Sequence, residues 1–144
     1  MRRAVSSIYY ALFHVAVRTV ALTFAGTNWR TDRFYLVYRS VEHKTVRDLC
    51  IEIAKPIPKA KLKTWFPPNG FSTNLKKFAE LYLEMYERRV RADYDPRAAS
   101  ETSLFSKNSV QEALKDARSA IAGYWAATTD ERALFATLLS YPAR

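Results

Sequence analysis

Apolar side chains recur along most of this chain with the spacing of helices rather than strands. Residues 3–24 are apolar on almost every side, as expected of a helix in the middle of a bundle. One polar stripe interrupts this segment, because four side chains fall on a single helical face. The stripe consists of Ser7, Tyr10, His14 and Arg18. Gly26 is suited to cap the end of this helix.

Further helices are predicted over residues 38–54, 72–95, from about 106–109 onward, and in a short last segment after Thr128. Residues 29–37 are mixed in character and give no assignment. Short loops between amphipathic helices favour an up-and-down arrangement. We therefore predict an all-α fold, an up-and-down bundle of four to five helices, with residues 1–144 as a single domain.

The 72–95 helix carries charge on its apolar face. At roughly 100° per residue, Arg89 and Asp93 fall in the middle of the arc formed by the apolar residues, whereas Arg88 and Arg91 fall outside it. The apolar arc consists of Leu75, Phe78, Ala79, Tyr82, Tyr86 and Val90. A buried charge is costly unless it is paired. We expect an inward-facing i, i+4 ion pair of Arg89 and Asp93, which staples the core or lines a polar cleft, and Arg88 and Arg91 in water.

Residues 55–70 carry four prolines, which forbid a regular helix through this segment. Lysines at 55, 59, 61 and 63 stand beside Trp65 and Phe66, so the segment could contact a phosphate backbone and stack a base. Alternatively it is a long connection, pinned to the bundle by its two aromatic residues and kept soluble by its lysines. We favour the connection.

The net charge of +9 favours a polyanionic partner such as RNA or DNA, although it also serves solubility. The single cysteine, Cys50, excludes an internal disulfide framework and fits a small core residue in a reducing compartment. No uninterrupted apolar stretch reaches the ~18 residues of a membrane span. We therefore expect a soluble, cytoplasmic protein that does not bind membranes.

The usual cofactor and metal motifs are missing from the sequence. It has no glycine-rich phosphate loop, no Cys/His zinc cluster and no paired carboxylates on one inward helix face. We therefore expect neither metal nor cofactor, and any catalysis must use arginine, histidine, aspartate and tyrosine. RNA cleavage through its own 2′-hydroxyl suits that set, since histidine exchanges the proton and arginine stabilises the phosphorane charge.

The two histidines each allow a functional and a structural interpretation. His14, on the polar stripe, is a candidate acid or base, or a core-edge residue bonded to Tyr10 or to a backbone carbonyl. His43, four residues after Arg39, is a second candidate, or an ordinary surface histidine. Tyr94 could hold a phosphate oxygen.

Two segments resemble the HEPN family of helical nucleotide-binding domains. The first, residues 4–14, reads Ala-Val-Ser-Ser-Ile-Tyr-Tyr-Ala-Leu-Phe-His, and the second, residues 88–96, reads Arg-Arg-Val-Arg-Ala-Asp-Tyr-Asp-Pro. They are similar to the branch with a Ser-Arg-x-Tyr-Tyr-Ala-x-Phe-His first helix and an Arg-x-x-x-Ala-Asp-Tyr end of the third. The likeness covers about residues 4–125.

This resemblance implies a four- or five-helix bundle that often dimerises face to face. Many HEPN proteins are metal-independent ribonucleases that act as toxins, in phage defence, or with a small nucleotidyltransferase. Arg88 or Arg89 takes the family's arginine position, with Arg89 favoured by helical phase, and Tyr94 takes that of a tyrosine which some partner nucleotidyltransferases modify. The family's histidine is replaced by Ala92 and Asp93.

Three hypotheses follow. In the first, the chain is an RNA-directed endoribonuclease toxin or defence module, with Arg89, Asp93 and His14 as catalytic residues and a binding surface around them. That surface comprises Arg88, Arg91, Tyr94, Tyr10 and His43. In the second, it binds a nucleotide or a partner, such as a nucleotidyltransferase antitoxin, without catalysis. In the third, it is the dimerisation domain of a larger protein. We expect a homodimer.

Overall fold

A computed structural model describes residues 1–99 and 103–141, and every regular element in these ranges is helical. The α-helices are α1 (Arg2–Ala25), α2 (Asp32–Ser40), α3 (His43–Ala54), α4 (Ala60–Lys63), α5 (Thr73–Tyr94), α6 (Lys107–Ala126) and α7 (Thr129–Ser140), with a 3-10 turn at Pro96–Ala99. The predicted all-α class is confirmed. The three longest helices, α1, α5 and α6, match the apolar pattern, but the described ranges contain seven α-helices where four to five were predicted.

Helix ends follow the local signals in the sequence. Ser72, Ser106 and Thr128 cap α5, α6 and α7, each hydroxyl accepting a hydrogen bond from the backbone N–H three residues later at 3.2–3.3 Å. Gly26 ends α1 with a φ of 84°, a conformation that a side chain would strain. Pro96 follows directly on the C-cap of α5.

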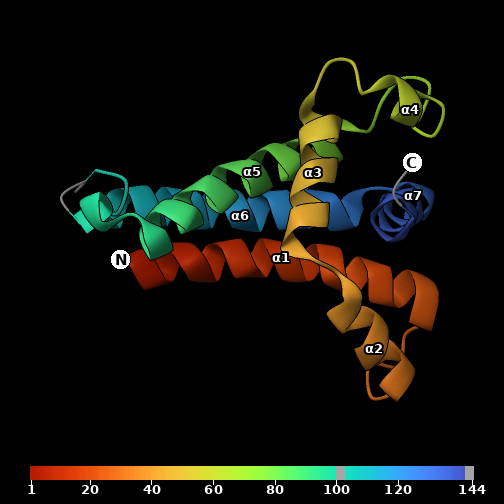
Figure 1. Cartoon of the computed structure of the whole chain (residues 1–144), viewed down its shortest axis with the longest axis horizontal. Coiled ribbons are helices and arrows are strands. Elements are labelled where there is room, and N and C mark those ends of the chain that lie inside the picture. Colours follow the sequence, from red (N-terminus) through yellow and green to blue (C-terminus); the bar gives the residue numbers. More distant parts are fainter. Residues whose placement is uncertain (100–102, 142–144) are drawn as a thin grey trace.

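Three long helices form the body of the bundle. Figure 1 shows α1, α5 and α6 lying alongside one another, with α5 running opposite to both of its neighbours. This part has the predicted up-and-down arrangement. α3 crosses over α5 at a steep angle, while α2 and the segment around α4 extend away from the body in opposite directions (Figure 1). α7 packs against α1 and α3.

The core is rich in aromatic rings and includes hydroxyl groups. Its largest fully buried side chains are Tyr9, Tyr82, Tyr124, Phe78 and Phe135. Buried hydroxyls are costly without partners. The Tyr124 hydroxyl donates to Thr19 Oγ1 at 2.7 Å, and Thr19 donates to the carbonyl of Val15 at 2.8 Å. Cys50 is fully buried, as predicted, and burial raises the pKa of its thiol.

The prediction of one helix over residues 38–54 is wrong. The chain is extended at Val41 and Glu42, which separate α2 from α3. The Ser40 hydroxyl donates to the Val37 carbonyl at 2.7 Å and occupies an acceptor at the end of α2. No proline or glycine marks this break, so the sequence pattern alone could not locate it. The break makes His43 the first residue of α3.

The 55–70 segment is fastened to the bundle, as in the favoured interpretation, by Phe66 as predicted and by Glu52, but not by Trp65. Glu52 is buried, and its two oxygens bind the Lys55 ammonium at 2.7 Å and the Lys59 backbone N–H at 2.9 Å. Phe66 packs edge-on against Phe71, with ring centroids 5.0 Å apart. Trp65, also predicted to pin the segment, is instead 59% exposed.

α1 is long and apolar enough, by length and composition, to cross a membrane, and it is the one such helix in the described ranges. In the bundle, 56% of its most apolar window is buried. Buried core helices of soluble proteins and N-terminal signal sequences also meet this criterion of length and composition. The absence of membrane binding and the cytoplasmic location therefore stay predictions.

Candidate functional site

Arg89 is held among three tyrosine rings where α5 packs against α1. Its guanidinium carbon lies 5.2 Å from the ring centroid of Tyr9, 5.6 Å from that of Tyr10 and 5.9 Å from that of Tyr94. The Arg89 side chain is only 15% exposed, which confirms its predicted inward orientation. Contacts of a cation with aromatic faces offset part of the cost of removing the charge from water.

Asp93, one turn later, orients the guanidinium. Arg89 Nε donates to Asp93 Oδ2 at 3.1 Å, which confirms the predicted i, i+4 pair, and Ser6 Oγ of α1 donates to Oδ1 at 3.0 Å. Asp93 does not face inward as predicted, since it lies at the rim of the cluster. The reason is that the buried face of α5 turns toward Met85 and Ala92.

The Arg89 guanidinium keeps hydrogen-bonding capacity. Its terminal nitrogens have no hydrogen-bond partner in the described part of the chain. They are also not buried, because the one buried side-chain nitrogen without a partner in these ranges is Nη2 of Arg2. The terminal nitrogens of Arg89 therefore reach solvent. Burial lowers the pKa of Arg89, but Tyr10, Tyr9 and Asp93 outweigh it and the net pKa is raised. The group stays cationic and can bind an anion.

His43 shares the tyrosines of Arg89. Its ring centroid lies 5.7 Å from that of Tyr9 and 5.8 Å from that of Tyr10, and it stacks on Phe13 at 3.8 Å. The interpretation of His43 as an ordinary surface histidine is therefore wrong. Arg39, four residues earlier, does not share the helix of His43: it lies in α2, with its guanidinium over the ring of Tyr35.

A chain of hydroxyls links His43 to α1 and α5. The Tyr9 hydroxyl lies 2.6 Å from Nδ1 of His43 and 3.0 Å from the Tyr82 hydroxyl. The direction of the first bond follows the tautomer of His43: with the ring proton on Nε2, Tyr9 donates to Nδ1, and with the ring proton on Nδ1, Tyr9 accepts from it. Nε2 has no protein partner in the described ranges and reaches solvent.

The surroundings of His43 favour its neutral form. Burial lowers the pKa of His43, and the nearby charges of Arg89 and His14 lower it further. A neutral imidazole can exchange a proton near pH 7, and Nε2 is the ring nitrogen without a protein partner in the described ranges. The cluster thus combines a fixed cation with a proton acceptor.

His14 has a partner that the sequence did not indicate. Its Nδ1 lies 2.5 Å from the Tyr38 hydroxyl, and the two rings stack with centroids 5.8 Å apart. The predicted bond of His14 to Tyr10 or to a backbone carbonyl is not observed. His14 is exposed on the face of α1 that carries Tyr10.

Arg88 lies outside the cluster. Its Nη2 pairs with Glu84 at 2.7 Å and its Nη1 donates to Ser109 of α6 at 3.4 Å, so the side chain is only 20% exposed. The expectation that Arg88 is left to water at the mouth of a cleft is wrong. Arg91, expected to be exposed as well, is half-buried. Tyr94 and Tyr10 do lie at the exposed edge of the cluster.

Four contributors to the cluster were missed as site residues. They are Ser6, Tyr9, Tyr38 and Tyr82. Helical spacing predicts Tyr82 on the apolar face of its helix, which is correct, and the rings of Tyr9 and Tyr82 are both fully buried. The available signal was chemical, because a buried tyrosine needs a hydrogen-bond partner for its hydroxyl.

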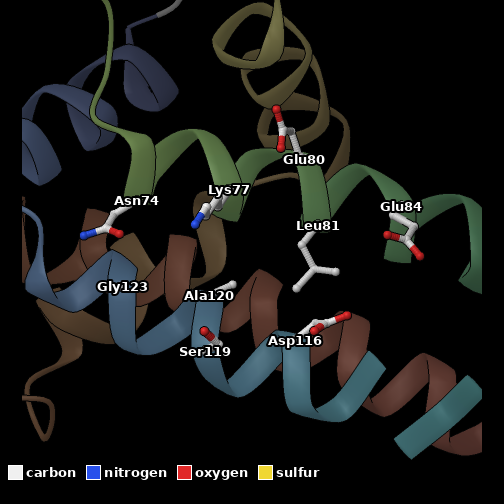
Figure 2. A pocket seen from close by; sticks show the side chains of 9 residues that line it. All are labelled: Asn74, Lys77, Glu80, Leu81, Glu84, Asp116, Ser119, Ala120 and Gly123. Carbon is white, nitrogen blue, oxygen red and sulfur yellow. The ribbon is translucent and has the colours of Figure 1, made fainter. Parts of the chain in front are cut away.

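A separate pocket between α5 and α6 has the opposite charge. Figure 2 shows Leu81 pointing across it toward α6, with Glu80, Glu84 and Asp116 around it. Lys77 is the one basic side chain in its lining. Carboxylates repel phosphate, so this pocket does not fit a polyanion.

Nothing in the described part of the chain groups three or more His, Cys, Asp or Glu side chains as metal ligands do. Compared with known proteins, the chain matches no family model, no curated protein and no solved structure. The class that the structure defines is an all-α helical bundle with an Arg–His–Tyr cluster, and the family likeness rests on the chain's own residues.

Proposed function

We propose that this protein is a HEPN-like, RNA-directed module that cleaves RNA without a metal or cofactor. One observation carries the proposal: the Arg89 guanidinium and the His43 imidazole lie against the same two tyrosine rings, Tyr9 and Tyr10. The Tyr-Tyr pair belongs to the first motif of the resemblance, and Arg89 to the second. His43 supplies the histidine that the second motif lacks.

The proposed reaction is a transesterification within the RNA strand. In the tautomer that carries its proton on Nδ1, His43 removes the proton of a 2′-hydroxyl at Nε2, and the hydroxyl oxygen attacks the adjacent phosphorus. The bond from phosphorus to the 5′-oxygen breaks, and that oxygen takes a proton from His14. The products are a 2′,3′-cyclic phosphate and a 5′-hydroxyl end. Arg89 binds the non-bridging oxygens as charge develops on them, and Asp93 positions Arg89 rather than reacting.

The same cluster supports a second candidate, a binding module without turnover. Asp93 neutralises part of the Arg89 charge. Such a module would hold a nucleotide, or a partner such as a nucleotidyltransferase antitoxin, and the exposed Tyr94 would be available for modification. Homodimerisation, with the two Arg89 clusters facing each other, and a role in toxin–antitoxin or phage-defence systems belong to either candidate.

The test is an incubation of the purified chain with total RNA in EDTA. We expect cleavage that Arg89→Ala and His43→Asn each reduce by 10²-fold or more, the usual scale for removing a proton-transfer or charge-stabilising group. Arg88→Ala is the matched control, since Arg88 is an adjacent arginine paired outside the cluster.

Intact RNA with the wild-type protein at every pH between about 5 and 9 would contradict the nuclease proposal. Binding of the same RNA that depends on Arg89 but not on Arg88 would then favour the binding module.

A further inference from the structure

A second anion-favouring surface lies farther along α1, where α2 leaves the body of the bundle (Figure 1). There a pocket of about 400 Å³ is lined largely by aromatic rings together with Arg18 of the polar stripe. The rings are those of Trp29, Phe34, Tyr35 and Tyr38. Trp29 is 67% exposed, and such exposure of a large aromatic surface marks a contact site when it occurs in a cluster.

Positive charge surrounds this pocket. The segment 27–40 contains three arginines and one aspartate. The guanidinium carbon of Arg30 lies 5.1 Å from the ring centroid of Trp29, and that of Arg39 lies 5.4 Å from that of Tyr35. Aromatic faces next to arginines are the arrangement with which proteins stack bases and hold the backbone of single-stranded nucleic acids.

Side-chain contacts connect the pocket to the Arg89 cluster. Tyr38, in its lining, bonds to His14, whose ring lies 6.0 Å from that of Phe13, and His43 stacks on Phe13 at 3.8 Å. Tyr10, His14 and Arg18 follow one face of α1 at four-residue intervals, so Arg18 lies ~12 Å along the helix from Tyr10. A strand bound at Arg89 would reach the pocket within a few nucleotides.

We propose that this pocket is a base-binding subsite for single-stranded RNA, in which a base flanking the cleaved position stacks on Trp29 and Tyr35. The inference rests on the proposed function and names the substrate class as unpaired RNA. Arg18 and Arg30 hold the adjoining phosphates. Because stacking needs only an exposed base face, the subsite selects single strands over duplexes and has little sequence preference.

The experiment measures binding of an uncleavable strand, 2′-O-methyl pentauridylate, against an abasic pentamer of the same backbone. We expect the wild type to bind the base-containing strand about tenfold more tightly, and Trp29→Ala to lose that difference. Trp65→Ala is the matched control, because Trp65 is 59% exposed but lies in the 55–70 segment.

Equal affinity of the wild type for the two strands would overturn the subsite. An equal loss of affinity for the base-containing strand in Trp29→Ala and Trp65→Ala would overturn it as well. If Arg89→Ala still abolished cleavage, the proposed function would stand without it. Conversely, Trp29-dependent binding without any cleavage would support the subsite and remove only the nuclease step. Sedimentation measures the oligomeric state of both tryptophan variants. If Trp29→Ala dissociated a dimer but left the binding of both strands unchanged, this surface would be a contact between copies of the chain, and the proposal would be overturned.

Discussion

At the scale of single residues, the decisive arrangement is a set of polar groups with shared partners. Tyr9 contacts Arg89 through its ring and His43 through its hydroxyl. The rotational phase of an amphipathic helix was sufficient to select Arg89. The same phase could not select His43, because its environment comes from α1 and α5 rather than from its own helix.

The Tyr9 hydroxyl is expected to contribute to stability as well as to the site. Tyr9→Phe removes the hydroxyl that links His43 Nδ1 to the buried Tyr82 hydroxyl. The free energy of unfolding should therefore fall by about 1–3 kcal/mol. Urea denaturation measures this change. Tyr10→Phe removes the hydroxyl of a partly exposed ring, so its free energy of unfolding should stay within about 0.5 kcal/mol of the wild-type value. Equal effects of the two substitutions would contradict the proposed hydroxyl chain.

His43 also predicts how stability depends on pH. Since burial, Arg89 and His14 lower its pKa from 6.5 in the folded state, the unfolded chain binds more protons just below pH 6.5. The contribution of His43 is therefore complete above pH 6.5 and is lost as the pH falls through the folded-state pKa. His43→Asn should flatten the dependence of the free energy of unfolding on pH just below pH 6.5, as measured by urea denaturation at each pH. An unchanged slope would mean that His43 is not held in its neutral form.

At the scale of elements, the ends of helices were easier to predict than the breaks within them. Hydroxyl caps and Pro96 identified the boundaries of α5, α6 and α7. The separation of α2 from α3 has no such marker, and it depends on the packing of both helices against the bundle. This separation makes His43 the first residue of a helix that crosses α5.

Glu52 is the expected anchor of the 55–70 segment. Glu52→Ala removes the acceptors of Lys55 and of the Lys59 backbone, so trypsin should cut at Lys61 and Lys63 several-fold faster under native conditions. Asp48→Ala is the control, because Asp48 is an exposed carboxylate on the same helix. Equal cleavage of the two variants and the wild type would show that Phe66 alone holds the segment.

At the scale of the whole molecule, charge and shape divide the surface into regions of different use. The pocket between α5 and α6 is lined by three carboxylates and one lysine, whereas arginines stand at the Arg89 cluster and beside the rings of α2. The net charge of +9 raises the rate and strength of encounters with polyanions without selecting a site. Local geometry must therefore provide the selection.

Salt dependence distinguishes a site contact from the general charge. If Arg89 binds a phosphate, Arg89→Ala should reduce the magnitude of the slope of log affinity against log salt by about 1 for the pentauridylate probe. Arg118→Ala, which removes an exposed arginine of α6, should leave the slope unchanged. An equal decrease in the magnitude of the slope for both variants would indicate that only the total charge of the protein determines the salt dependence of binding. Fluorescence anisotropy over a range of salt concentrations makes the measurement.

The sequence by itself determined the helical class, the capped helix ends, the buried cysteine and the inward orientation of Arg89. These properties depend on spacing and local chemistry within single segments, which one chain displays directly. Only the tertiary structure decided that His43 joins Arg89, that Arg88 bonds to Ser109 of α6, and that Tyr38 binds His14. Such contacts depend on how helices cross and where they break, and packing across many residues sets that geometry.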